Sequence, residues 1–203
     1  QLAKLSLNFG EHVLADTNAF SLHIRNEEEL RGLPQSAIGM AKQMAEAKNF
    51  DGWLFTLDYP SYVPFMTYAE NRELRQQMSK AFGQRGFQQN ENNNEETILS
   101  IVQLKHQRAS LLGYESHAAF VLEERMAKDE ETVVAFLNDL KEKSYPKAKE
   151  EWEEILRYGK ERLGYTEVKK WDTSFISEKI KQERFTFNEE ELKPYFSLPK
   201  VLK

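Results

Sequence analysis

The histidines are the first residues to consider for chemistry, because an imidazole can bind a metal ion or carry a proton near neutral pH. The 203 residues include no cysteine and four histidines: His12, His23, His106 and His117. Zinc-dependent hydrolysis uses two histidines on one helix face with a carboxylate base, as in the pattern H-E-x-x-H. No histidine here is followed by glutamate, and the nearest histidines lie 11 positions apart. We therefore predict no catalytic residue and no metal ligand within this chain.

Three arginines, Arg72, Arg75 and Arg85, allow two interpretations. A guanidinium suits bidentate recognition of a carboxylate, so these residues could bind an acidic group of a substrate. They could equally form ion pairs with Glu70 and Glu73 on a solvated helix face. We favour the solvated face and assign no residue to substrate binding.

Aromatic residues are concentrated just before these arginines. Those within a stretch of sixteen positions include Trp53, Tyr59, Tyr62, Phe65 and Tyr68. They could line a groove for peptides, but most clusters of this kind belong to a hydrophobic core, which is the interpretation we favour. Ser61 and Ser116 stand at predicted helix starts, where N-capping explains them better than nucleophilic catalysis.

Composition limits the classes of partner. The net charge of −5 and the pI of about 5.6 argue against a nucleic-acid partner, because no basic excess is present to neutralise phosphates. No run approaches the roughly 18 apolar residues of a membrane span, so we expect no membrane partner. We expect a cytoplasmic protein, or a periplasmic one if a signal peptide preceded Gln1. The absence of an initiator Met and the helix-starting character of Pro199 suggest a piece excised from a longer protein.

The elements that position these residues are predicted to be mainly α-helical. Apolar residues at helical spacing predict helices over 1–18, 35–48, 61–69, 72–83, 96–112, 116–125, 130–163 and 172–184. Pro146 is expected to kink the helix over 130–163. Predicted caps of helices and short turns are Asn26, Asn71, Ser116, Asp129, Asp172 and Asn188.

Two short segments read as strands and one segment as a loop. Residues 20–24 alternate between apolar and polar side chains, and residues 53–57 are rich in aromatic and β-favouring types. We expect them to pair as one small two-stranded β-sheet, with helix 35–48 as the connection. Residues 86–96 are polar and without periodicity, which is typical of a flexible surface loop.

Seven short motifs, in order, resemble the thimet oligopeptidase family of zinc metallopeptidases. They are FGEHVL (9–14), ELRGLP (29–34), TLDYPSY (56–62) with NRELR (71–75), LLGY (111–114), MAK (126–128), WD (171–172) and LKPYF (192–196). Each motif alone is weak, but seven with similar spacing are specific. The chain is most similar to the bacterial branch of peptidyl-dipeptidase (dipeptidyl carboxypeptidase) and oligopeptidase A. After residue 172 the family usually has an aromatic residue and a Tyr-Tyr pair, whereas this chain reads TSFI.

The resemblance implies a mostly helical, two-lobed hydrolase whose deep channel admits short peptides and excludes folded proteins. Zinc, held by H-E-x-x-H and a downstream glutamate, would be its cofactor. Residues 1–203 would then be a single fragment of the metallopeptidase domain, upstream of that motif. The fragment would form channel wall and framework, be inactive alone, and have the remainder of the polypeptide as its partner. Dipeptide release and internal cleavage both remain open.

A non-enzymatic helical interaction module is the alternative. Its support is the missing metal motif and the long amphipathic helix over 130–163.

Overall fold

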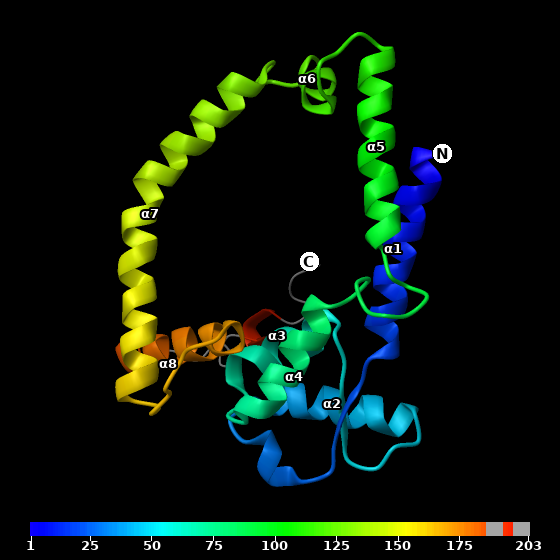
Figure 1. The fold of residues 1–203 in the computed structure, drawn as a ribbon. Coiled ribbons are helices and arrows are strands. Elements are labelled where there is room, and N and C mark those ends of the chain that lie inside the picture. Colours follow the sequence, from blue (N-terminus) through cyan, green and yellow to red (C-terminus); the bar gives the residue numbers. More distant parts are fainter. Residues whose placement is uncertain (186–192, 197–203) are drawn as a thin grey trace. The chain divides into compact units, whose positions relative to one another are not determined.

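The computed structural model describes residues 1–185 and 193–196. It divides into two compact units, which are described separately: unit 1 comprises Gln1–Thr17 and Gln84–Glu153, and unit 2 comprises Asn18–Gly83 and Glu154–Lys203. Figure 1 follows the elements along the chain. The predicted cap Asn188 and the suggested helix start at Pro199 lie outside the described residues, as does Leu192 of the last motif.

Helices dominate the described chain, as predicted. In chain order the elements are α1 (Leu2–Ala19), β1 (Leu22–Ile24), η1 (Glu27–Leu30), α2 (Gln35–Ala47), β2 (Trp53–Phe55), α3 (Tyr59–Tyr68), α4 (Arg72–Gly83), α5 (Glu95–Leu111), α6 (His117–Leu122), α7 (Glu130–Glu161), η2 (Lys170–Asp172), α8 (Thr173–Phe185) and η4 (Lys193–Phe196). Within residues 1–185 and 193–196, no helix has both the length and the apolar character that crossing a membrane requires.

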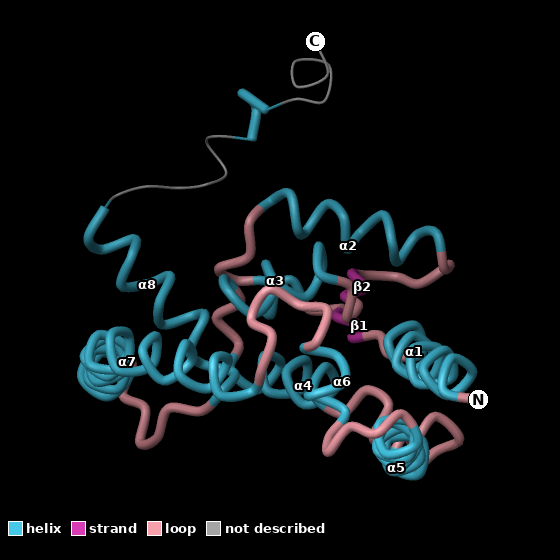
Figure 2. The backbone as a smooth tube through the Cα atoms, turned by 90° about the horizontal axis from the view of Figure 1, so that it is seen from above, coloured by secondary structure: helices cyan, strands magenta, loops and turns pink. Residues whose placement is uncertain are grey.

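Unit 2 contains the predicted sheet. The strands β1 and β2 pair antiparallel, with Leu22 opposite Phe55 and Ile24 opposite Trp53. Both strands are shorter than predicted, but α2 connects them as expected. Figure 2 shows the two strands beside α2 and α3. Leu22 and Ile24 are buried and the residue between them is half-buried, which is the two-residue period that identified the strand.

The core of unit 2 brings residues from the sheet together with α3 and α4. Its buried members include Ile24, Phe55, Leu57, Phe65 and Met78. On α2 the buried side chains belong to three alanines at 37, 41 and 45. Met44 on the same helix is 39% exposed.

Unit 1 holds the predicted loop against α1. In Figures 1 and 2, α1 and α5 lie side by side, with the loop at one end of the pair. The buried carboxylate of Asp16 accepts hydrogen bonds from the Gly86 N–H at 2.7 Å and from the side chains of Asn90 and Asn92. These bonds hold the pKa of Asp16 below its ordinary value, although burial by itself raises that pKa. The flexibility of residues 86–96 stays a prediction.

The later elements of unit 1 follow the predicted capping pattern. Ser116 caps α6 by accepting from the Ala119 N–H at 2.9 Å, and Asp129 accepts from the Thr132 N–H at 2.7 Å. The helix begun by Ser116 ends at Leu122, three residues earlier than predicted. The long helix α7 continues past Pro146, so the proline does not end it.

Candidate functional site

The histidines occupy separate environments. The Nδ1 atom of His12 lies 2.9 Å from the side-chain oxygen of Asn94, and His23 contacts the backbone carbonyl of Asp51. The Nδ1 atom of His117 is buried with no hydrogen-bond partner among the described residues. In that part of the chain, no three His, Cys, Asp or Glu side chains are grouped to hold a metal ion. The described residues therefore do not fit a catalytic zinc ion.

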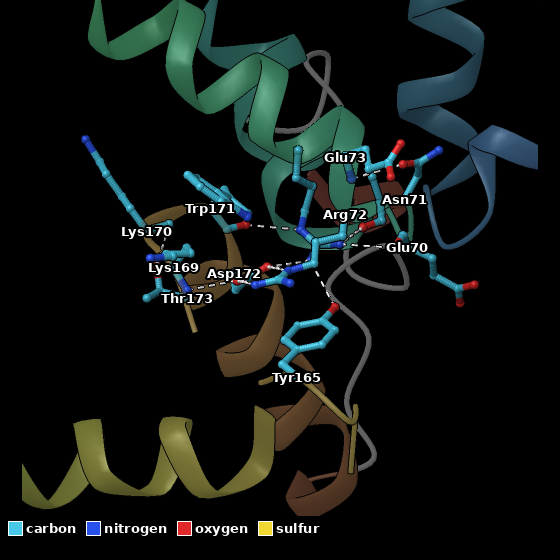
Figure 3. Close-up of polar contacts among 12 residues, drawn as sticks. Glu70, Asn71, Arg72, Glu73, Tyr165, Lys169, Lys170, Trp171, Asp172 and Thr173 are labelled. Carbon is cyan, nitrogen blue, oxygen red and sulfur yellow. Dashed lines mark hydrogen bonds and ion pairs between the residues drawn. The ribbon is translucent and has the colours of Figure 1, made fainter. Parts of the chain in front are cut away.

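The most elaborate polar cluster in unit 2 surrounds Asp172. Arg72 on α4 donates two hydrogen bonds to this carboxylate, from Nε at 2.9 Å and from Nη2 at 2.7 Å. Arg75, one turn later on the same helix, donates to the carboxylate from Nη2 at 3.0 Å. The backbone N–H of Lys169 gives a further bond at 2.9 Å. Figure 3 shows Arg72 and Asp172 directed toward one another, with Tyr165 next to them.

Arg75 is fully buried, so each of its donors needs an acceptor. The guanidinium donates to backbone carbonyls of Ala69 at 2.6 Å and Trp171 at 3.1 Å, and to the Tyr165 hydroxyl at 3.2 Å. One face of the guanidinium lies over the ring of Phe175, 4.1 Å from its centre. These contacts join α4 to η2 and α8, and they leave Arg75 inaccessible to a substrate. The cluster therefore has a structural role: it holds α4 against η2 and α8.

The comparisons with known proteins place the chain in a family. The profile of peptidase family M3 matches residues 65–203. The chain belongs to this family. Oligopeptidase A of Haemophilus influenzae is 39% identical over the whole chain, and oligopeptidase A of Escherichia coli is 36% identical over 97% of it. The dipeptidyl carboxypeptidase of E. coli is 27% identical over the whole chain. The M3 chain spans about 30% of the length of these relatives.

The family membership confirms the resemblance found in the motifs. In this M3 chain the Asp172 cluster joins two of those motifs, because Arg72 and Arg75 belong to NRELR and Asp172 belongs to WD. The motifs are about 100 positions apart and nothing in their local sequence shows that they meet. Their common occurrence in one family pattern was the only signal that could have paired them.

Two interpretations of the charged residues were wrong. The side chains of Arg72 and Arg75 bind Asp172 rather than those of Glu70 and Glu73. Asp172 was predicted to cap the final helix. Its carboxylate instead accepts hydrogen bonds from the two arginines and from the Lys169 N–H. The third arginine, Arg85, lies in unit 1 and donates to the Thr17 hydroxyl at 3.2 Å.

The aromatic residues contribute mainly to the core of this M3 chain. Phe65 is fully buried and meets Phe55 edge to face at 4.8 Å between ring centres. Tyr62 stacks on Phe82 at 4.1 Å, whereas Tyr59 is 70% exposed. A mainly apolar pocket of about 200 Å³ lies between α2 and β2, but the five aromatic residues do not line it.

Ser61 contributes to local structure at the start of α3. Its hydroxyl accepts from the Thr56 N–H at 2.9 Å and so ties the end of the strand region to the helix.

The Asp172 cluster makes the stability of the chain depend on pH. Burial raises the pKa of Asp172, but hydrogen bonds from Arg72, the Lys169 backbone and Arg75 outweigh it and lower the pKa below its ordinary 3.8. The folded state therefore binds this proton less readily than the unfolded state, so the stabilisation is complete above the unfolded pKa and is lost as pH falls through the folded one.

We expect the difference in unfolding free energy between the wild type and Asp172→Asn to be constant above about pH 5 and to shrink below about pH 4. Urea unfolding of both proteins between pH 7 and pH 2.5 measures it, and a difference that stays constant to the lowest pH would contradict the assignment.

Proposed function

We propose that the whole protein is a zinc-dependent peptidase acting on short peptides, and that this chain is the part of its catalytic domain preceding the H-E-x-x-H motif. The observation that supports this most strongly is the M3 match, together with relatives that align over the whole chain while the chain spans about 30% of their length. The same match argues against a non-enzymatic interaction module.

In this proposal the chain contributes framework and channel wall. Among the described residues, no three metal-binding side chains are grouped to hold zinc, so none of them is assigned a catalytic step. What they do offer is rigidity: the β1–β2 sheet, the core around Phe65 and the Asp172 cluster each fix elements of unit 2 against one another. Zinc, when bound by the remaining polypeptide, would polarise the scissile carbonyl and acidify a bound water.

The relatives favour internal cleavage over dipeptide release. Identity with the proteins named oligopeptidase A is 36–39%, compared with 27% for the E. coli dipeptidyl carboxypeptidase. Two plant relatives, named organellar and probable cytosolic oligopeptidase A, are each 36% identical. Product analysis on a blocked octapeptide separates the two activities, because an enzyme that releases C-terminal dipeptides leaves a substrate with an amidated C-terminus uncut.

The decisive experiment compares two proteins on one fluorogenic peptide. The chain of 203 residues, supplied with zinc, is expected to show no turnover above the zinc-only control. The longer polypeptide encoded by the same reading frame is expected to hydrolyse the peptide and to lose activity when its motif glutamate is replaced by glutamine. Zinc-dependent turnover by residues 1–203 alone would refute the framework role. An inactive longer polypeptide that folds and binds zinc would refute the peptidase assignment.

A further inference from the structure

The mainly apolar pocket between α2 and β2 has a volume of about 200 Å³. Its lining includes Ala37, Ala41 and Leu54, each at most 3% exposed. Figure 2 shows α2 running beside β2 and α3. Sites for cofactors and drug-sized ligands are larger, at about 300–1,000 Å³, whereas an apolar cavity of about 150 Å³ is enough to hold benzene. The pocket is therefore of a size to hold one large apolar side chain.

Two methionines of α2 form the accessible part of the pocket wall. Met40 and Met44 both line the pocket and are 46% and 39% exposed. They lie four positions apart, so their side chains are neighbours on one face of the helix. A thioether side chain is flexible and polarisable, and it makes favourable contacts with aromatic rings. This entrance therefore suits an aromatic side chain better than a polar one.

A carboxylate lies beside this apolar wall. Asp58 lines the pocket at the N-cap position of α3, but its side chain makes no capping bond to that helix. One of its oxygens accepts the hydroxyl hydrogen of Thr56, which also lines the pocket, at 3.0 Å. No lysine or arginine within residues 1–185 and 193–196 forms an ion pair with Asp58. The negative charge next to the pocket is therefore available to a cationic group of a ligand.

We propose that this pocket binds the N-terminal residue of a peptide when that residue has a large apolar side chain, such as that of phenylalanine. The side chain occupies the apolar cavity, and the α-ammonium group pairs with the Asp58 carboxylate. The pocket and its charge are properties of unit 2 alone, whereas the choice of a peptide as the ligand rests on the proposed function. The proposal assigns binding to these residues and no catalytic step.

The test is an NMR titration of the 203-residue chain with ¹³C-labelled methionine methyl groups. Met40 and Met44 report on the pocket, Met66 and Met78 lie in the core of unit 2, and Met126 is fully exposed in unit 1. The probe is phenylalanyl-glycine amide. We expect saturable shifts of the Met40 and Met44 resonances with a dissociation constant on the order of 1 mM, and no shift of Met126. The resonances of Met66 and Met78 show whether the core is folded.

Two further probes separate the side chain from the charge. The N-acetyl form of phenylalanyl-glycine amide lacks the ammonium group, and we expect it to bind about threefold more weakly, because an exposed ion pair contributes little. Glycyl-glycine amide keeps the ammonium group but lacks the apolar side chain. We expect it to cause no saturable shift, since the apolar cavity supplies most of the affinity.

Matched variants locate the binding. Ala37→Leu places a side chain in the pocket and is expected to weaken the binding of phenylalanyl-glycine amide at least about tenfold. Its control is Ala47→Leu, at an exposed position of the same helix outside the pocket. Asp58→Asn is expected to weaken that binding about threefold and to leave the affinity of the acetylated probe unchanged. Its control is Asp51→Asn, which removes an exposed carboxylate outside the pocket.

Four results would overturn the proposal. The first is no saturable shift of Met40 or Met44 by phenylalanyl-glycine amide up to about 10 mM. The second is equal affinity for glycyl-glycine amide, and the third is unchanged affinity in folded Ala37→Leu or Asp58→Asn chains. The fourth is the loss of these shifts in the longer polypeptide, because the remaining polypeptide would then fill the pocket. None of these results measures hydrolysis, so the peptidase assignment is tested separately by the fluorogenic peptide.

Discussion

Replacement of Asp172 by alanine is expected to lower the free energy of unfolding by about 3–5 kcal/mol, the cost of leaving a buried charge without its partner. Asp172 and Arg75 both have fully buried side chains, and the second arginine on this carboxylate, Arg72, is 34% exposed. The variant therefore leaves the Arg75 guanidinium in the interior with carbonyl acceptors but no counter-charge. Equilibrium unfolding in urea, followed by circular dichroism, measures the change.

An exposed ion pair of the same chemistry provides the control. Asp139 and Lys143 lie one turn apart on α7 at 2.7 Å, with side chains that are 54% and 72% exposed. Asp139→Ala should change the free energy of unfolding by less than about 0.5 kcal/mol, because water already screens that pair. Adding Arg75→Ala to Asp172→Ala should restore part of the loss, since the two residues act as one unit. Equal, small effects of Asp172→Ala and Asp139→Ala would contradict the stabilising role of the Asp172 cluster.

Replacement of Phe65 by alanine is expected to cost about 3–5 kcal/mol of unfolding free energy. Phe65 is 0% exposed and packs edge to face on Phe55 of β2, so its removal leaves a cavity between α3 and the sheet. The same denaturation experiment measures this loss.

Tyr59→Ala on the same helix is the matched comparison. Tyr59 is 70% exposed and meets Phe82 only at 6.0 Å between ring centres, so a change below about 1 kcal/mol is expected. This pair of variants also distinguishes between a core role and a groove-lining role for the aromatic cluster. A groove-lining role for Phe65 would predict that Phe65→Ala leaves stability nearly unchanged.

The sequence was sufficient at several positions where a structure depends on near neighbours. Asn71 was predicted to cap α4, and its side chain accepts from the N–H groups of Glu73 and Leu74 at 3.1 and 3.2 Å. Gly113 follows the end of α5 with φ of +83°, a conformation that glycine adopts at little cost. Such features follow from residue types within one or two turns, so their physical cause is present in the local sequence.

The sequence was insufficient for polar side chains whose partners are remote. Asp172 is 97 positions from Arg75, and Asp16 is 70 positions from Gly86, so neither pairing has a periodic or local signature. The composition of residues 86–96 indicated a polar loop correctly but not that a carboxylate on α1 binds it.

The separation between Arg75 and Asp172 also affects how the chain is made. When the ribosome has completed α4, both strands and the aromatic pair Phe55 and Phe65 already exist, but Asp172, whose carboxylate binds Arg75, has not been synthesised. At about 5–20 residues per second, the 97 intervening residues take about 5–20 s to appear. Until then the Arg75 guanidinium has a lower free energy in water than in the interior, and this delays the final packing of α4. Unit 2 therefore begins to fold early, but it completes the packing around Arg75 only after the ribosome has synthesised Asp172.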